Sequence, residues 1–250
     1  MLKTRVIPCL LLQNGRLVKT VNFDDEKYVG DPINAVKIFN DKEVDELILL
    51  DISATVEKKK PNFALISQIA NECFMPLAYG GGIKSIDEIK KILNSGTEKV
   101  VINSYAIENP LFIKKAAEIF GNQSIVISID VKKNKLGNYA IFTNNGKKET
   151  GLNPKDFVVQ MEKMGAGEIF LNSIDKDGTM QGFDLDLISE VSKTIDIPLI
   201  ACGGAGKVED FSKAIRAGAS AISAGSMFVF YGRQRAVLIN FPSQKELDLI

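Results

Sequence analysis

The sequence predicts a (β/α)8 barrel, an α/β fold in one domain over residues 1–250, because eight short apolar segments alternate with segments of helical period. The apolar segments, which predict parallel strands, lie at residues 6–11, 46–51, 76–79, 99–103, 124–130, 168–172, 198–202 and 221–225. The amphipathic segments, which predict helices, lie at residues 32–42, 63–73, 85–94, 110–120, 154–164, 184–193 and 207–217. A Rossmann-like sheet is the alternative, but the GxGxxG motif expected after its first strand is missing.

The chain also repeats itself at about half its length. Pro76 aligns with Pro198, and Ser104 with Ser226, without a gap. Each of the two stretches reads as strand, Gly-Gly, helix, Gly, strand and Ser. A repeat of this kind predicts two half-barrels of four βα units each, and it favours the barrel over the open sheet.

One segment, residues 131–151, interrupts the alternation. It is polar, and it ends a short apolar run with Asn144-Asn145-Gly146, which is typical of a tight turn. We therefore expect a small β-hairpin inserted after the fifth strand, on the active face of the barrel.

The charge balance excludes an obvious nucleic-acid or membrane partner. Lys plus Arg equals Asp plus Glu at 31 each, and hydrophobic residues make up 45% of the chain, enough for a large core. The apolar run at residues 6–12 is too short to span a membrane, and its flanks do not suit a signal peptide. These features predict a soluble cytoplasmic protein.

Histidine is absent from the sequence, which removes Ser-His-Asp and Cys-His catalysis and every histidine metal site. Acid–base chemistry must therefore come from carboxylates, lysine, tyrosine or cysteine. Cys9, Cys73 and Cys202 form no CxxC motif, so neither a disulfide framework nor a thiolate zinc site is expected. We interpret them as small buried residues, and we expect no metal or organic cofactor.

The repeated glycines follow the predicted third and seventh strands, as Gly80-Gly81-Gly82 and Gly203-Gly204. Asn103-Ser104 and Gly225-Ser226 follow the fourth and eighth strands in the same way. Glycine lets backbone N–H groups approach an anion closely, and barrels often bind phosphate at these places. Tight turns that need positive φ are the alternative. Two related copies favour two phosphate sites, and hence a ligand with phosphate at both ends.

Three carboxylates at strand ends are further candidates. Asp130 ends an apolar strand, where it could act as a general acid or base or stand on the rim. Asp51 ends the second strand and could support the site. Asp177, which follows the sixth strand, could cap a turn or order a phosphate loop.

Four charged residues stand at strand starts, namely Arg5, Glu46, Lys99 and Glu168. They would be exposed on the rim, or they would form a ring of two positive and two negative charges across the barrel floor that acts as a gate. Lys19 is expected in a loop after the first strand, either as a solvated surface residue or as a mobile lysine covering an anionic substrate.

Over nearly its whole length the chain resembles the cyclase subunit of imidazole glycerol phosphate synthase. The matching stretches include residues 15–19, 22–23, 30–32, 45–47, 50–52, 80–83, 129–130, 146–148, 165–168, 173–179 and 203–207. This family has a (β/α)8 barrel and uses ammonia from a separate glutaminase subunit, which docks on the N-terminal face of the barrel. The ammonia passes through the barrel to the far mouth.

The resemblance implies a role for each candidate residue. The gate of the ammonia channel would be Arg5, Glu46, Lys99 and Glu168. One phosphate of the substrate would be held by Gly82, Asn103 and Ser104. The other phosphate would be held by Asp177, Gly178, Gly204, Gly225 and Ser226. Lys19 would lie on a mobile loop over the substrate, and Asp130 would be one of two catalytic aspartates.

The second catalytic aspartate of the family should end the first strand, where this sequence has Leu11. Leucine cannot shuttle a proton, and loss of one member of an acid–base pair costs about a hundredfold or more in rate. Ala78 and Cys202 also replace residues that are often polar in the family, and residues 231–242 do not resemble its usual final helix.

These departures resemble a sister branch found with surface-polysaccharide genes. That branch also has Leu-Leu-Leu at the end of the first strand and Tyr-Val-Gly-Asp-Pro at residues 28–32. It is thought to work with a glutaminase and a third, amidotransferase-like protein to convert an N-acetyl group on a nucleotide-linked sugar into an acetamidino group. Two other hypotheses stay open: the histidine-pathway cyclase, and a silent barrel that only binds and activates the glutaminase. Without histidine the chain cannot hydrolyse glutamine through a Cys-His pair, so glutamine use requires a separate glutaminase.

Overall fold

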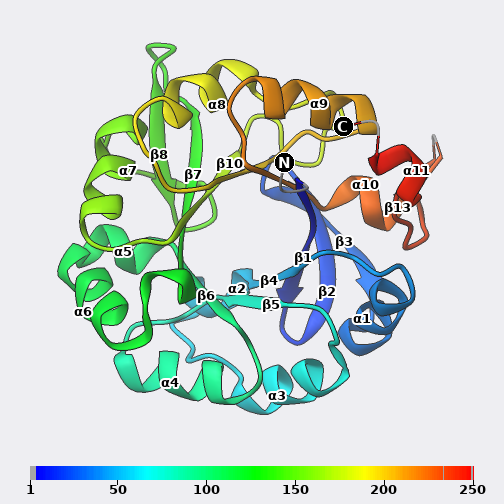
Figure 1. The fold of residues 1–250 in the computed structure, drawn as a ribbon, viewed down its shortest axis with the longest axis horizontal. Helices are drawn as coiled ribbons and strands as arrows, with labels where there is room; N and C mark the ends of the chain where they lie inside the picture. Colours follow the sequence, from blue (N-terminus) through cyan, green and yellow to red (C-terminus); the bar gives the residue numbers. More distant parts are fainter. Residues whose placement is uncertain (1–3, 233, 249) are drawn as a thin grey trace.

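Eight parallel strands pair in a closed ring and form the barrel (Figure 1). The computed structural model describes residues 4–232, 234–248 and 250. In order of pairing the barrel strands are β1 (Arg5–Gln13), β4 (Leu47–Asp51), β5 (Leu77–Gly80), β6 (Lys99–Ile102), β7 (Ile125–Lys133), β10 (Glu168–Ser173), β11 (Leu199–Cys202) and β12 (Ala221–Ala224). β12 pairs with β1 and closes the ring. The predicted (β/α)8 barrel is confirmed.

Helices surround the ring of strands (Figure 1). The seven predicted helices are present as α1 (Pro32–Asp41), α3 (Phe63–Glu72), α4 (Ile86–Asn94), α6 (Pro110–Phe120), α7 (Pro154–Lys163), α8 (Leu185–Ser192) and α9 (Val208–Arg216). Their starts follow ordinary capping rules: the Ser85 side chain accepts from the Glu88 N–H, and Glu88 bonds back to the N–H of Ser85. The short α2 (Ile52–Val56) and α5 (Ser104–Glu108), and a 3-10 turn at Asn122–Ser124, were not predicted.

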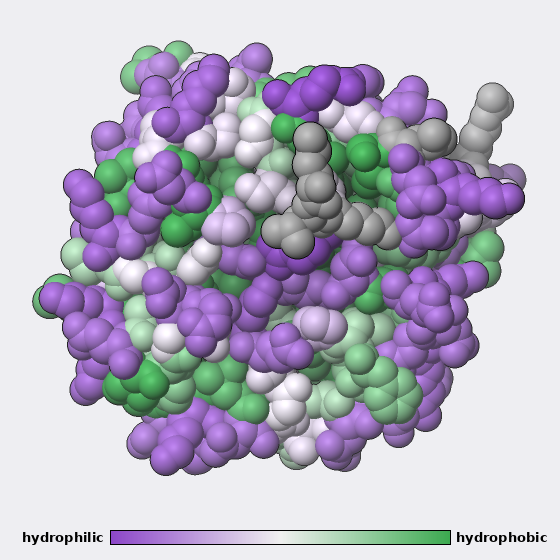
Figure 2. All heavy atoms as spheres, viewed as in Figure 1, coloured by the Kyte–Doolittle hydropathy of each residue, from purple (hydrophilic) through white to green (hydrophobic). Residues whose placement is uncertain are grey.

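The barrel interior is packed with apolar side chains, because alternate residues of each strand point inward. The inward cluster consists of Ile7, Cys9, Ile48, Ala78, Val101, Val126, Phe170, Ile200, Cys202 and Ala221, with Leu11 and Leu50 packed against it. A larger cluster lies between the strands and the helices. The two layers leave polar residues for the ends of the barrel and for the surface, where hydrophilic residues cover most of the visible face (Figure 2).

The segment after β1 is a hairpin, not the loop that the sequence led us to expect. β2 (Arg16–Val21) pairs antiparallel with β1 and with β3 (Asp24–Gly30). The turn at Asn14-Gly15 has positive φ at both residues, 49° and 78°, as in the tight turns that best join twisted strands. The expected loop position of Lys19 and its interpretation as a solvated surface residue are therefore wrong, because this residue lies in β2 and is buried.

The polar segment at residues 131–151 extends the fifth barrel strand. β7 continues to Lys133, β8 (Tyr139–Thr143) pairs with it antiparallel, and β9 (Lys148–Glu149) pairs with β8. The segment therefore shares a strand with the barrel instead of forming a separate hairpin after it. The turn between β8 and β9 has positive φ at Asn144, Asn145 and Gly146.

The last part of the described chain runs along the outside of the barrel beside α10 (Ser226–Val229) (Figure 1). It contains a two-stranded ribbon of β13 (Phe230–Tyr231) and β14 (Ala236–Val237), followed by α11 (Gln244–Leu247). Lys27 Nζ donates to the carbonyl of Arg235 at 2.7 Å, which ties the ribbon to β3. Among the described residues, no helix is both long and apolar enough to cross a membrane.

Candidate active site

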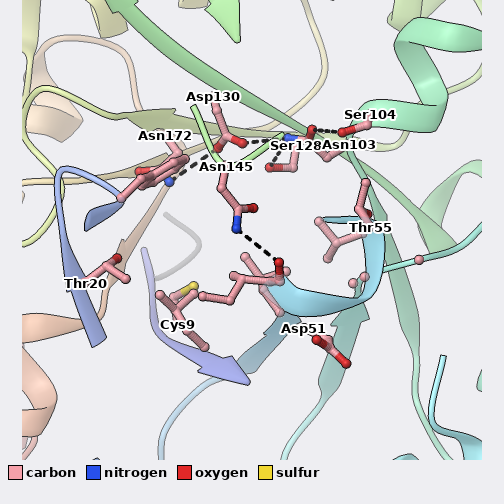
Figure 3. A pocket seen from close by; sticks show the side chains of 18 of the residues that line it. Cys9, Thr20, Asp51, Thr55, Asn103, Ser104, Ser128, Asp130, Asn145 and Asn172 are labelled. Carbon is pink, nitrogen blue, oxygen red and sulfur yellow. Dashed lines mark hydrogen bonds between the residues drawn. The ribbon is translucent and has the colours of Figure 1, made fainter. Parts of the chain in front are cut away.

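A cavity opens at the carboxyl ends of the barrel strands (Figure 3). Side chains of β1, β4, β6, β7, β10 and β11 line it, namely Cys9, Leu11, Leu50, Val101, Ser128, Asp130, Asn172 and Cys202, with Asn103 just past the end of β6. The β2–β3 hairpin adds Lys19, Thr20 and Phe23, and the β8–β9 turn adds Asn144 and Asn145. Asn145 Nδ2 crosses the mouth and donates to the carbonyl of Ile52 at 3.2 Å (Figure 3). The two hairpins therefore partly cover the cavity.

Asp130 lies between two amide side chains in this cavity (Figure 3). Asn103 Nδ2 donates to Oδ2 at 2.9 Å, and Asn172 Nδ2 donates to Oδ1 at 3.4 Å. Burial raises the pKa of Asp130 to about 7, although the two amide bonds oppose the shift, and the charge of Asp177 adds to it. A carboxyl group with a pKa near neutrality can either donate or accept a proton at physiological pH. The predicted position of Asp130 inside the mouth is confirmed, and its catalytic role stays a prediction.

Leu11 lines the same cavity, and its side of the mouth is apolar. Leu11 and Leu50 pack against the inward cluster, beside the buried thiols of Cys9 and Cys202. A hydrogen bond with Cys202, together with burial, raises the pKa of the Cys9 thiol. Protonated thiols of this kind are weak nucleophiles, so Cys9 behaves as the small buried residue that we expected. The half-buried Cys73 lies away from the cavity, and burial raises its pKa to about 11.

The first glycine loop brings its predicted residues to the cavity. Gly82, Asn103 and Ser104 all line it, and Ser104 Oγ donates to Asn103 Oδ1 at 3.1 Å. Gly81 and Gly82 have φ of 127° and 71°, and a Cβ on Gly82 would lie 2.7 Å from the carbonyl oxygen of Lys59. The turn geometry by itself requires these two glycines, so phosphate binding here stays a prediction.

The second loop is held by a buried ion pair. Lys19 Nζ donates to both carboxylate oxygens of Asp177 at 2.9 Å and to the carbonyl of Thr20 at 3.1 Å. Only 5% of Lys19 is exposed, so it is neither a surface lysine nor free to cover a substrate in this conformation. Asp177 and Gly225 line the cavity, whereas Gly178, Gly204 and Ser226 are not among its lining residues.

Asp51 and Asp175 both make hydrogen bonds to nearby backbone. Asp51 Oδ1 accepts from the N–H groups of Ser53 and Ala54 and caps α2, and Asp51 also lines the cavity, so its support of the site stays a prediction. Asp175 Oδ2 accepts from the N–H of Lys133.

The four charges at the opposite end of the barrel form a closed ring. Arg5 Nη1 donates to Glu46 Oε2 at 2.5 Å, and Arg5 Nη2 donates to Glu168 Oε1 at 2.8 Å. Lys99 Nζ completes the ring with bonds to Glu46 Oε1 at 2.9 Å and to Glu168 Oε2 at 3.2 Å. Burial lowers the pKa of Arg5, but Glu168 and Glu46 outweigh burial and raise it overall. The four residues therefore form a ring and are not separate charges on the rim. The use of this ring as a gate stays a prediction.

Comparison with known proteins now decides the family. A model described as "Histidine biosynthesis protein" matches residues 5–234. The chain belongs to the HisF-type family of imidazole glycerol phosphate synthase subunits. It is 50% identical to "Putative imidazole glycerol phosphate synthase subunit hisF2" of Pseudomonas aeruginosa, over 100% of both chains. It is 48% identical to "Putative imidazole glycerol phosphate synthase subunit HisF" of Leptospira interrogans, over 100% of this chain and 99% of that one. Identity to "Imidazole glycerol phosphate synthase subunit HisF" of Clostridium botulinum strain Okra is 46%, over 92% of each chain.

Several polar residues of this HisF-type site were missed by sequence reasoning. Ser128 lies two residues before Asp130, and Asn172 ends the predicted sixth strand, so the inward alternation of the strands could have found both. Asn172 Oδ1 is buried and accepts no hydrogen bond from the described residues. Arg235 lies far along the chain, yet its Nη2 donates to the carbonyl of Gly178 at 2.8 Å and approaches Ser226 Oγ at 3.3 Å. No local pattern indicates that contact.

The candidate site offers no set of metal ligands. Within residues 4–232, 234–248 and 250, no group of three or more His, Cys, Asp or Glu side chains is placed to hold a metal ion.

Proposed function

We propose that this protein is the ammonia-using subunit of a glutamine amidotransferase complex, and that its acceptor is an N-acetyl group on a nucleotide-linked sugar. A separate glutaminase would dock at the strand-start end of the barrel and release ammonia at the charged ring. A third, amidotransferase-like protein would take part in the reaction at the other end.

The closed ring of charges supports the part of this proposal in which ammonia enters the barrel. Ammonia is small and uncharged, so its free energy of desolvation is low. For an ion, the free energy of desolvation on entering the apolar interior beyond the ring is large. The inward residues above the ring include the small Ala78 and Ala221. An interior of this kind favours passage of the neutral molecule over ammonium.

The presence of Leu11 in the cavity is the observation that most supports an N-acetyl group as the acceptor. It puts hydrocarbon on the side of the cavity opposite Asp130, where two-carboxylate acid–base chemistry would need a second acid, and Leu50 extends the apolar wall. An apolar wall suits a methyl group, such as that of an acetyl. Exchange of the amide oxygen for nitrogen joins ammonia to the amide carbon and releases water. Asp130, with its pKa near 7, would take a proton from the added nitrogen.

Reconstitution with a HisF-type glutaminase partner tests the proposal against the histidine-pathway reaction. The assay supplies glutamine and the histidine-pathway ribonucleotide and follows the absorbance change as aminoimidazole carboxamide ribotide is released. We expect stimulated glutamine hydrolysis and no cyclisation. Cyclisation at an ordinary rate would place the protein in histidine synthesis and contradict the assigned acceptor. If the barrel only activates the glutaminase, a nucleotide-linked N-acetyl sugar and the third protein should also give no amidine.

A pair of substitutions at one position isolates the effect of Leu11. Leu11→Asp restores a carboxylate opposite Asp130, and we expect it to raise cyclisation about a hundredfold above the wild-type background. Leu11→Asn adds similar polarity without an acid and serves as the control. Equal rates in the two variants would mean that position 11 does not decide the chemistry.

A further inference from the structure

Arg235 lies in the ribbon at the end of the chain, beside the second glycine loop. One of its guanidinium nitrogens, Nη2, contacts the Gly178 carbonyl and the Ser226 hydroxyl, at 2.8 and 3.3 Å. Ser226 is only 4% exposed, so the guanidinium lies on a buried hydroxyl at the rim of the loops. The sequence predicted phosphate binding by Gly178, Gly204 and Ser226, but it supplied no cation for these residues.

The charge of Arg235 is not neutralised by a carboxylate. Among residues 4–232, 234–248 and 250, no Asp or Glu lies within ion-pair distance of it, and the nearby Asp177 is already paired with Lys19. A guanidinium has five N–H donors, and only those on Nη2 contact the described protein. Its Nε and Nη1 donors therefore stay available, in the fork geometry that matches phosphate oxygens.

The position of Arg235 is fixed by contacts that do not use those donors. Its guanidinium carbon lies 4.9 Å from the centre of the Phe230 ring, and Lys27 bonds its carbonyl. Its φ is +50°, in the left-handed region that most non-glycine residues avoid. A costly backbone conformation held by several contacts often marks a functional position.

We infer that Arg235 is a phosphate ligand of the second glycine loop, together with Ser226 and the loop around Gly178 and Gly204. The inference rests on the phosphate-bearing substrate of the proposed function. It assigns a use to residues 231–242, which do not resemble the family's final helix. The bound group is a phosphate ester or the diphosphate of a nucleotide-linked sugar.

Calorimetric titration of the free full-length protein with inorganic phosphate, and separately with pyrophosphate, tests this inference. We expect Arg235→Ala to weaken binding at one site at least about tenfold, the effect of one charge-assisted contact. Arg235→Lys should retain part of the affinity, because it keeps the charge and loses the fork. Arg216→Ala, which removes an exposed arginine at the end of α9, is the matched control and should bind as the wild type does.

The outcomes separate this inference from the proposed function. Wild-type affinity in Arg235→Ala would overturn the role of Arg235 and leave the phosphate loops intact. Tighter binding in that variant would also overturn it, because Arg235 would then compete with the ligand. A wild-type protein that binds neither probe would overturn the phosphate sites themselves, while the ammonia route would still be tested by the reconstitution. Preference for pyrophosphate that is lost with Arg235 would assign the site to a diphosphate.

Discussion

At the scale of single residues, Asp130 shows how burial sets chemistry. Its carboxyl group ends an apolar strand, and the surrounding protein raises its pKa from 3.8 to about 7. Two amide donors stabilise the ionised form, but they do not offset the loss of water. The group therefore changes protonation within the physiological range, where a proton-transfer residue is most effective.

This shift predicts a dependence of stability on pH. Because the folded state holds the proton more tightly than the unfolded state, the contribution of Asp130 is complete below about pH 4 and is lost as pH rises towards 7. Asp130→Asn should remove that dependence and gain roughly 1–3 kcal/mol of unfolding free energy over the wild type between pH 4.5 and pH 8. Urea unfolding of both proteins at pH 4.5 and at pH 8 measures this difference in unfolding free energy. Asp25→Asn, a change at an exposed site, should show no such difference.

Some single residues of the site could be predicted from the sequence, and others could not. Asp130 and Gly82 could, because strand ends and glycine turns leave local signals. Asn172 and Arg235 could not be assigned contacts, because their partners lie 42 and 57 residues away. Leu11 was visible only through resemblance to a family, since leucine at a strand end is otherwise ordinary.

At the scale of elements, the β2–β3 hairpin is the main departure from expectation. Burial along β2 does not alternate, because Leu17, Val18, Lys19 and Thr20 are all buried, and the two polar residues among them hide the strand from a reading of hydrophobic period. Their burial depends on Asp177, which follows a distant strand. The hydrophobic period of the sequence predicted the barrel strands and the seven long helices. It did not predict this hairpin, because the burial of Lys19 depends on an ion pair with a residue distant in sequence.

That ion pair predicts a large cost for removing one partner. Lys19→Met leaves the Asp177 carboxylate buried and unpaired, so we expect a loss of about 3–5 kcal/mol of unfolding free energy or local opening of the hairpin. Chemical denaturation and hydrogen exchange across β2 and β3 distinguish the two. Lys19→Met with Asp177→Asn should recover much of the loss. Lys37→Met breaks the exposed pair with Glu72 and should cost below about 1 kcal/mol. Equal costs at the two lysines would show that the buried pair does not hold the hairpin.

At the scale of the whole molecule, the length of the barrel separates a ring of charges from the cavity that holds Asp130. The charged ring closes one end, the cavity with Asp130 opens at the other, and apolar side chains fill the space between them. The closed strand ring was predictable in full from alternation and repeat. The proposed use of its two ends could not be predicted from alternation or repeat, because it involves a separate partner that the sequence of this chain indicates only through resemblance.

The separation predicts a distinct phenotype for a ring variant. Lys99→Met removes the bonds to Glu46 and Glu168, so the ring can no longer stay closed around a defined path. In the complex with the glutaminase we expect glutamine-dependent product formation to fall by roughly tenfold, about 1.4 kcal/mol on the rate, while the rate with added ammonium salt is unchanged. Ammonium supplied from solution can reach the open mouth without passing the ring.

The matched control is Lys90→Met, on the exposed face of α4, which should change neither rate. Glutaminase turnover in the Lys99→Met complex must also be measured, because a loss of docking would lower the glutamine-dependent rate by another cause. If both nitrogen sources fall together while turnover and the folded fraction stay normal, the ring supports the cavity instead of admitting ammonia. A fall with glutamine alone ties the ring to passage through the barrel, since the two assays share every step beyond it.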